Sequence, residues 1–379
     1  MQFIRPDINL DIIGKRYIVI GLSLLVIGLG IASLALHGGP IYGIDFAGGT
    51  EIRVRFAEPV HTDAVRKALA PLGMGKATVQ LYGAASANEY RIYSNLEQIS
   101  AVAAKAKAEA AKDAKNGTDM QSQLNQGVGS RVQAALSEAL KNKVEVRSVE
   151  MVGPQVGKDL REKALYAIFY SLLFMAVYIA YRFESKLVPA IIMAAIMAGT
   201  LLLFTLFLNN LAFLITIAFV EAFLLFWLLR LPYALGAVVS LLHDVLITVG
   251  IFSLLSKEFT LPFVAAILTI IGYSINDTII VYDRIRENTK KLHRQPMEEI
   301  INRSINETLS RTILTSGTVM IVLIALFFFG GEVIHDFSLA LIIGVITGTY
   351  SSIYIASPIV IVFQQFSKNP RVAAVKKSS

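Results

Sequence analysis

Cysteine is absent from this chain, which excludes disulfide bonds and thiolate metal sites. Charged residues are scarce at 17% of 379, whereas about a quarter is typical of soluble domains. The sequence also lacks a glycine-rich nucleotide loop with its lysine, a cluster of metal ligands and a nucleophile–base pair. We therefore expect neither an enzyme nor a bound cofactor or metal. What the chain has instead is apolar sequence: 55% hydrophobic residues and a mean hydropathy of +0.60, which predict an integral membrane protein.

Apolar runs of about 20 residues, long enough to cross a bilayer, predict eight membrane spans. They are Tyr17–Leu36, Ala164–Tyr181, Leu187–Leu208, Leu211–Leu229, Ala234–Leu255, Phe263–Tyr282, Ile313–Phe329 and Phe337–Phe363. Residues 33–35 (SLA) are similar to a signal-peptidase site, but the run before them is longer than a usual signal peptide. We expect the first span to be retained.

Positive charge is concentrated in alternate loops. Lysine and arginine precede the first span and follow the second, fourth, sixth and eighth. The opposite loops are Asn209-Asn210, Ser256–Pro262 with a single lysine, and Gly330–Asp336 with none. The positive-inside rule therefore predicts cytoplasmic termini and an extracytoplasmic polar segment, 37–160. The same distribution explains the net charge of +7 without nucleic-acid binding, so we expect contact with membrane lipids and no nucleic-acid partner.

The polar segment predicts an α+β domain. Glu51–Phe56, Ala77–Leu81, Tyr90–Tyr93 and Val144–Met151 have the pattern of strands. Helices are expected over Asp63–Ala70, with Thr62 as N-cap, over Ile99–Lys115 and over Ser130–Lys141. The order β-α-β-β-α-β, with a doubled second helix, is typical of a ferredoxin-like fold. The lysines of Ile99–Lys115 are read as a solvated helix face.

Seven sequence motifs follow one another along the chain. They are Gly43–Thr50 (GIDFAGGT), Val152–Gly157 (VGPQVG), Arg182–Glu184 (RFE), Leu235–Val245 (LGAVVSLLHDV), Ile271–Asn288 (IGYSINDTIIVYDRIREN), Asn306–Gly317 (NETLSRTILTSG) and Phe329–Gly331 (FGG). Together they resemble the SecF family, membrane subunits of the bacterial Sec protein-export machinery. The first motif supplies the outer-face residues of that family, here Asp45, Phe46, Gly48, Gly49 and Thr50.

The resemblance implies a polytopic helix bundle similar to that of resistance-nodulation-division proteins, located in the cytoplasmic (inner) membrane. It implies a role, with SecD, in using the proton-motive force to promote translocation of secretory preproteins. It also implies partners in the SecYEG channel, YajC and YidC. The expected parts are a cytoplasmic N-terminus (1–16), a first span (17–36), an extracytoplasmic domain (37–160), a second span (161–184), an inserted hairpin (185–233), a four-helix core (234–366) and a basic tail (367–379).

The inserted hairpin departs from the usual SecF pattern, in which RFE leads almost directly into the LGA span. The insertion turns at Asn209-Asn210 and adds an even number of spans, so the expected topology downstream is unchanged. Glu221 lies midway along its second helix, where we expect a neutral, hydrogen-bonded carboxyl group. Docking of another membrane subunit is one interpretation of the hairpin.

Asp277 and Arg311 are the sequence's candidates for proton coupling. Asp277 precedes Arg284 by two turns, about 10 Å, and Arg311 begins the next span from the same side. Ionisable groups at membrane depth cost roughly 2.5–3.5 kcal/mol on insertion scales and usually serve a function. We hypothesise that Asp277 takes up a proton, releases Arg311 and lets the helices shift. The resemblance places the family's functional Asp and Arg at these two positions, and a static packing pair is the alternative.

Other polar residues lie near this pair. Ser274 and Asn276 precede Asp277, and Thr315, Ser316 and Thr318 follow Arg311, where most are expected to form interhelical hydrogen bonds. His243 and Asp244 lie near mid-membrane, and either a proton path or a buried polar network fits them. Asp283, Arg284, Arg286 and Glu287 are expected to anchor a helix end. Gly344-x-x-x-Gly348 predicts close helix approach.

Two functional classes remain at this point. The first is the proton-driven export subunit. The second is half of a proton-coupled small-molecule exporter of the resistance-nodulation-division type, whose members usually carry two outer loops on about twelve spans. A purely structural scaffold is a weaker third. The SecF-like motifs favour the first over the second, and the buried charges favour both over the third.

Overall fold

The computed structural model describes residues 10–82, 88–94, 120–184, 191–192, 195–196, 199, 211–292 and 294–368. The chain divides into two compact units. One comprises Met1–Ile41 and Ala164–Ser379, and the other comprises Tyr42–Lys163. Each unit has its own hydrophobic core, made in the first by helix faces and in the second by one face of a sheet.

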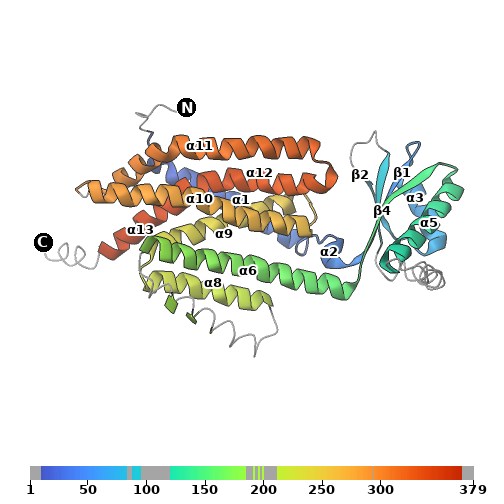
Figure 1. Cartoon of the computed structure of the whole chain (residues 1–379), viewed down its shortest axis with the longest axis horizontal. Helices are drawn as coiled ribbons and strands as arrows, with labels where there is room; N and C mark the ends of the chain where they lie inside the picture. The colour runs from blue at the N-terminus through green and yellow to red at the C-terminus, as the bar shows by residue number, and fades with distance from the viewer. Residues whose placement is uncertain are drawn as a thin grey trace. The chain divides into compact units, whose positions relative to one another are not determined.

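The first unit is a bundle of long helices (Figure 1). Its elements are η1 (Ile13–Lys15), α1 (Arg16–Leu36), α6 (Pro154–Glu184, which begins in the second unit), α8 (Leu211–Leu228), α9 (Pro232–Leu254), α10 (Leu261–Lys291), α11 (Met297–Phe329), α12 (Glu332–Ser351), the π-helix η5 (Ser352–Ala356) and α13 (Ser357–Lys368). Among the described residues, six helices are long and apolar enough to cross a membrane. They contain six of the eight expected spans.

The inserted hairpin is described only in part. Its first helix, predicted over Leu187–Leu208, falls almost wholly outside the described residues, whereas its second is α8. Glu221 is half-buried on α8. The predicted helix Ile99–Lys115 also lies outside the described residues.

Two helices extend well past their expected spans. Helix α10 continues from the predicted end at Tyr282 to Lys291, and α11 begins at Met297, long before the predicted start at Ile313. The charged segment between the two spans is therefore mostly helical. Its side chains pair within and between the two helices: Arg284 contacts Glu287 of its own helix and Glu307 of α11, both at 2.6 Å.

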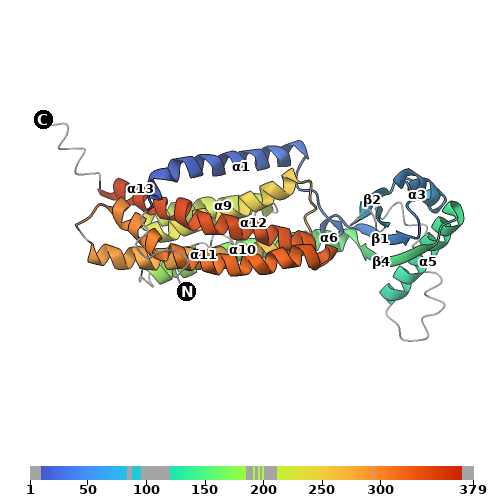
Figure 2. The same ribbon diagram turned by 90° about the horizontal axis from the view of Figure 1, so that it is seen from above.

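Helix α12 packs against α10 through glycines. A Cβ atom on Gly344 would lie 2.2 Å from the Ile270 side chain, and one on Gly348 would lie 2.9 Å from the Cβ of Ser274. This confirms the predicted close approach at the GxxxG motif. Helix α1 meets α9 in the same way, since a Cβ on Gly30 would lie 2.5 Å from the Cα of Gly250. Figure 2 shows α1 running alongside α9.

The last span is helical throughout but changes its hydrogen-bond pattern. Helix α12 passes at Ser352 into the π-helix, which then continues as α13. A side chain of α10 stabilises the wider π turn, because the Tyr282 hydroxyl donates to the Ala356 carbonyl at 3.0 Å. Single π turns occur often at functional sites.

The second unit contains a four-stranded antiparallel sheet. Its elements are α2 (Ile44–Ala47), β1 (Gly49–Phe56), α3 (Thr62–Leu69), η2 (Ala70–Leu72), β2 (Thr78–Tyr82), β3 (Glu89–Ser94), α5 (Met120–Leu140) and β4 (Val144–Val152). The strand order is β2-β3-β1-β4, and β1 is paired on both sides. Alternate β1 residues, Ile52, Val54 and Phe56, are buried in the core with residues of α3 and α5.

The strands lie close to their predicted ranges, but two helix starts differ. Helix α5 begins at Met120, well before the predicted start at Ser130, so the expected break does not extend to Ser130. The predicted N-cap Thr62 is the first residue of α3, and the N-cap is His61. His61 has extended backbone angles (φ −73°, ψ 136°), and its Nδ1 accepts a hydrogen bond from the Asp63 amide at 3.4 Å. An imidazole nitrogen here takes the place of the expected threonine hydroxyl.

Candidate functional site

Asp277 is buried in the helix bundle, with 2% of its surface exposed. Its Oδ2 accepts a hydrogen bond from the Ser316 hydroxyl of α11 at 3.3 Å. Ser316 Oγ in turn accepts from Thr349 of α12 at 2.8 Å and from Tyr273 of α10 at 3.4 Å. The carboxyl group is thus linked to two further helices by hydroxyl groups.

Arg311 does not reach Asp277 directly. Within the part of the chain that the structure describes, no ion pair joins the two side chains, and Arg311 is exposed on α11. The guanidinium is close enough for its charge to act on the Asp277 carboxyl group. The contact expected from the sequence is therefore replaced here by Ser316, which lies on the same helix as Arg311.

Two other predicted residues lie apart from this site. Asn276 is exposed. Thr315 donates within its own helix, to the carbonyl groups of Arg311 and Thr312, both at 3.0 Å. The sequence does not show which of Ser316 and Thr315 contacts Asp277, because only the rotation of α11 against α10 decides which hydroxyl faces the carboxyl group. Thr349 was not among the predicted residues, although the hydroxyl-rich run 347–352 was a visible signal.

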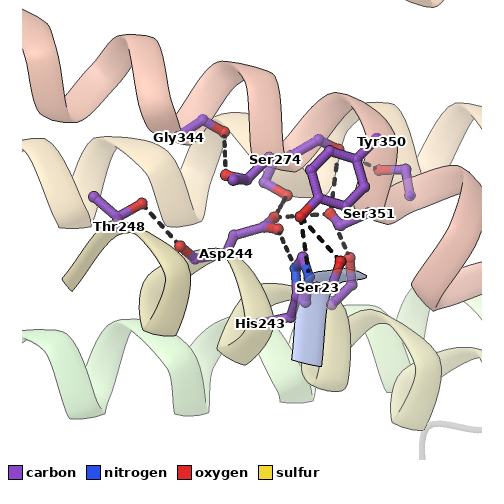
Figure 3. Close-up of polar contacts among 12 residues, drawn as sticks. Ser23, His243, Asp244, Thr248, Ser274, Gly344, Tyr350 and Ser351 are labelled. Carbon is purple, nitrogen blue, oxygen red and sulfur yellow. Dashed lines mark hydrogen bonds and ion pairs between the residues drawn. The ribbon is translucent and has the colours of Figure 1, made fainter. Parts of the chain in front are cut away.

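Asp244 forms a second buried polar site, shown in Figure 3. This carboxyl group has no exposed surface. Its Oδ1 contacts His243 Nδ1 at 2.9 Å, and its Oδ2 accepts from the hydroxyls of Ser274 at 2.5 Å and Ser351 at 2.9 Å. Ser240 donates to Ser351 at 2.9 Å. The structure therefore places the predicted residues His243, Asp244 and Ser274 together.

The imidazole extends this site to the first span. His243 Nε2 lies 3.3 Å from the Tyr350 hydroxyl, which lies 3.2 Å from Ser23 Oγ of α1. With an ionised Asp244, His243 donates through Nδ1, so neutral His243 accepts from Tyr350 at Nε2. Tyr350 then accepts from Ser23. The result is an ordered chain of donors from α1 to the carboxylate (Figure 3).

The arrangement allows proton chemistry at two carboxyl groups in one apolar bundle. Burial favours the neutral form of a carboxylic acid, whereas hydroxyl and imidazole donors favour its charged form. Because the hydroxyl groups can both donate and accept, each site can keep its hydrogen bonds in either state of the acid. The bundle therefore holds two acids that can change charge without losing their contacts.

The predicted outer-face motif connects α2 to the start of β1 in the second unit. Asp45 and Phe46 lie in α2, and the chain then turns through Gly48 (φ +71°) and Gly49 (φ +132°). A Cβ on Gly49 would lie 2.9 Å from the Ser94 carbonyl oxygen. The Tyr93 hydroxyl donates to the Gly48 carbonyl at 2.9 Å, and Thr50 is fully buried. The motif is thus a tight backbone junction.

The sheet also carries charges on the face away from its core. Glu51 lies 3.0 Å from Arg53 and 3.9 Å from Arg91. Partial burial opposes the charge of Arg53, but hydrogen bonding to Glu51 and the nearby Tyr82 and Glu150 outweigh it and raise the pKa of the guanidinium. Arg53 accordingly stays charged at any physiological pH.

Comparison with family models gives two matches. The model described as "Protein export membrane protein SecD/SecF, C-terminal" matches residues 132–226 and 205–366. The "SecD/SecF GG Motif" model matches residues 36–60, which include the tight junction at Gly48 and Gly49.

Comparison with individual proteins agrees. A protein translocase subunit SecF from Magnetococcus marinus is 41% identical, over 99% of this chain and 98% of its own length. A SecF from Koribacter versatilis is 35% identical, over 99% of this chain and 96% of its own length.

Two solved structures are similar as well. A crystal structure of SecDF from Thermus thermophilus, described as a translocon-associated membrane protein, has a TM-score of 0.64 and 28% identity over 96% of this chain. A SecDF structure in a super-membrane-facing form has a TM-score of 0.55 and 29% identity over 99% of this chain. The chain spans 40% and 41% of those two SecDF chains. On its sequence and its fold, this chain belongs to the SecF family.

Proposed function

We propose that this protein is a SecF subunit that couples proton movement to the export of secretory proteins, and that Asp277 is its proton-binding group. The observation that carries the proposal is the burial of Asp277 on α10 against a hydroxyl of α11, the helix that bears Arg311. A proton on Asp277 removes the charge that attracts the Arg311 guanidinium. The preferred position of α11 against α10 then changes.

The absence of a direct contact between Asp277 and Arg311 among the described residues fits a pair that forms in only one state of a cycle. In the state seen here, the Ser316 hydroxyl donates a hydrogen bond to the Asp277 carboxylate. The ion pair belongs to another state, in which α11 has moved and the Arg311 guanidinium reaches the ionised carboxylate beside the Ser316 hydroxyl. A static packing pair would instead be formed permanently. The name that the relatives share, translocase subunit, supports export rather than small-molecule efflux.

The orientation and domains belong to the same proposal. The sheet has the strand order β2-β3-β1-β4, and its described elements follow the order β-α-β-β-α-β, which together support a ferredoxin-like domain. We place the protein in the inner membrane. Positive charge on alternate loops supports cytoplasmic termini and an extracytoplasmic location for residues 37–160. The hairpin 185–233 is an added pair of spans, and the core 234–366 is the coupling unit. We infer no enzymatic activity.

A partner is supported by the surface of α11. Arg311 is exposed there, on the same helix face as the exposed Val322 and Phe329, which follow it by 11 and 18 residues. A cation facing lipid at membrane depth is costly, so we infer that another membrane protein covers this face. The similar solved structures are of SecDF, which supports SecD as that partner. We propose SecYEG, and then YajC and YidC, as the further assembly, with preproteins as substrate.

The test is export of a preprotein into inverted vesicles that contain this chain, SecD, the channel and its motor. Wild type, Asp277→Asn and Asp336→Asn are compared with and without a proton gradient. Asp336 is the control because its carboxylate is partly exposed and pairs with Lys257 at 2.8 Å. We expect Asp277→Asn to abolish the gradient-dependent part of export while the complex still assembles.

The control should retain gradient-dependent export. If Asp277→Asn also retains it, the carboxyl group of Asp277 is structural and the proposal is wrong. Arg311→Lys tests whether charge alone is enough at this position, because lysine keeps the positive charge but lacks the planar guanidinium with its paired N–H donors. We expect partial activity from that variant.

A further inference from the structure

Four consecutive hydroxyl residues of α12 and its π turn, Thr349, Tyr350, Ser351 and Ser352, contact four different helices. Thr349 bonds to Ser316 of α11, Tyr350 to Ser23 of α1 and His243 of α9, Ser351 to Asp244 and Ser240 of α9, and Ser352 to Thr278 of α10 at 2.8 Å. Successive helical residues point about 100° apart, so four of them reach around the helix. We name this set the hydroxyl tetrad.

The tetrad touches the surroundings of both buried acids. Thr349 is one hydroxyl away from Asp277, through Ser316. Ser351 bonds directly to Asp244, and Tyr350 bonds to the imidazole of His243. Asp277 and Asp244 lie on different helices, and neither acid depends on the other for its own contacts. Helix α12 is therefore an element that both acids share, beside α10, which carries Asp277 and supplies Ser274 to Asp244.

Three members of the tetrad have a choice of acceptor. Thr349 Oγ1 lies 2.8 Å from Ser316 Oγ and 2.6 Å from the carbonyl of Val345 on its own helix. Ser351 and Ser352 each have the carbonyl of Gly348 within reach, at 3.3 Å and 3.0 Å. A hydroxyl group has a single proton to donate. Each therefore donates either across helices or back along α12.

The protonation state of Asp277 decides which acceptor Thr349 uses. When Asp277 is ionised, Ser316 donates to the carboxylate, and Thr349 is free to donate to Ser316. When Asp277 is protonated, its own O–H donates to Ser316, Ser316 donates to Thr349, and Thr349 must donate to Val345. Both bonds between Asp277 and Thr349 therefore reverse direction, and the added proton allows one further bond, from Thr349 to the Val345 carbonyl.

We infer that the hydroxyl tetrad is the positioning device that passes a change at Asp277 to the His243–Asp244 site and to α1. A change in the Thr349 bond shifts the last turn of α12, and Tyr350 and Ser351 move with Thr349 because they follow it in that turn. The π turn that follows gives this part of the span a hydrogen-bond pattern that can slip. The titratable groups outside the tetrad that contact it are Asp244 and His243 directly, and Asp277 and Tyr273 through Ser316.

This inference rests on the proposed function, so its test uses the same vesicles. Thr349→Val removes the hydroxyl at nearly constant volume, and Thr349→Ser keeps it. Thr347→Val is the matched control, because Thr347 is buried on the same helix but bonds only to its own backbone, at Ile343 and Gly344. We expect Thr349→Val to lower the gradient-dependent part of export about fivefold, the size expected for one lost hydrogen bond.

Rescue by the conservative variant distinguishes a positioning role from a structural one. Thr349→Ser and Thr347→Val should export at the wild-type rate, and Thr349→Val should leave gradient-independent export and assembly of the complex unchanged. Equal behaviour of Thr349→Val and Thr347→Val, beside an inactive Asp277→Asn, would overturn the tetrad and leave the proposed function standing. Intact export by Asp277→Asn would overturn the proposed function, and the tetrad with it.

Discussion

At the scale of single residues, the two buried acids differ in how many donors hold them. Asp244 accepts from His243, Ser274 and Ser351, whereas Asp277 accepts from Ser316 alone at a longer distance. A carboxylate held by several donors is fixed in place by structure. One held by a single weak donor is free to exchange partners, which suits the proposed role of Asp277.

Replacement of each aspartate by asparagine should lower the stability of the protein by different amounts at the two sites. In Asp244→Asn, the NH2 group faces either the N–H of His243 or two serine hydroxyls that must both turn to accept, and we expect a loss of about 1–3 kcal/mol in the free energy of unfolding. In Asp277→Asn, the remaining oxygen still accepts from Ser316, and we expect a loss below about 1 kcal/mol. Thermal unfolding of the purified variants in detergent measures both. Equal losses would show that the extra donors on Asp244 contribute nothing to stability.

The glycine junction before β1 gives a second test at this scale. Gly49 has φ +132°, and a Cβ there would meet the Ser94 carbonyl oxygen at 2.9 Å. We expect Gly49→Ala to destabilise the second unit by roughly 1–3 kcal/mol. Hydrogen exchange of the β1 and β3 amides is the measurement. Gly153→Ala is the control in the same unit, since its Cβ would meet only Val156 at 4.0 Å, and unchanged exchange in both variants would refute the strain.

At the scale of elements, the contact between α10 and α12 depends on the missing side chains of two glycines. The atom nearest to a Cβ on Gly344 belongs to the side chain of Ile270, which can be shortened. We expect Gly344→Ala to destabilise the bundle by about 1–3 kcal/mol, the usual cost of overpacking. Adding Ile270→Ala should recover part of that loss.

The control for this pair lies on α10 itself. A Cβ on Gly272 would meet nothing within 4 Å, so Gly272→Ala should leave stability unchanged or raise it slightly. Thermal unfolding and the yield of assembled complex report on all three variants. A Gly344→Ala loss that Ile270→Ala fails to relieve would mean that the helices are not held at this spacing by the glycines.

The elements also show what the sequence can predict. Runs of apolar residues located the spans, and alternation located the strands, because both patterns follow directly from which face is buried. The ends of α10 and α11 were predicted too short, because charged residues such as Arg284 and Glu307 satisfy each other on helices that leave the hydrocarbon. Hydropathy alone does not reveal such pairing.

The site was predictable by residue type and less so by contact. Single carboxyl groups in apolar runs marked Asp244 and Asp277, since burial makes such groups conspicuous. Their partners depend on how each helix is rotated. Ser316 and Thr315 are adjacent in sequence, yet only Ser316 bonds to Asp277. Tyr350 and Ser351 became partners of His243 and Asp244 only through the packing of α12 against α9.

At the scale of the whole bundle, the structure suggests which helices move together. Helices α1 and α9 meet backbone to backbone at Gly30 and Gly250, and the hydroxyls of Ser33 and Ser253 lie 2.8 Å apart. Close backbone contact leaves little room for sliding. By contrast, α11 contacts Asp277 through a single hydroxyl. We therefore expect α1 and α9 to move as one body and α11 to move against α10.

A disulfide between α1 and α9 tests this division. The chain has no native cysteine, so Ser33→Cys with Ser253→Cys introduces the only two thiols, at positions whose side-chain oxygens are already in contact. We expect the bond to form with mild oxidant and to leave gradient-dependent export unchanged, because the joined helices do not need to separate. The single variants, Ser33→Cys and Ser253→Cys, control for the lost hydrogen bond. If oxidation stops export and a reductant restores it, α1 must slide along α9 during the cycle, and the path of coupling through Tyr350 and Ser23 would then end in a moving first span rather than a fixed one.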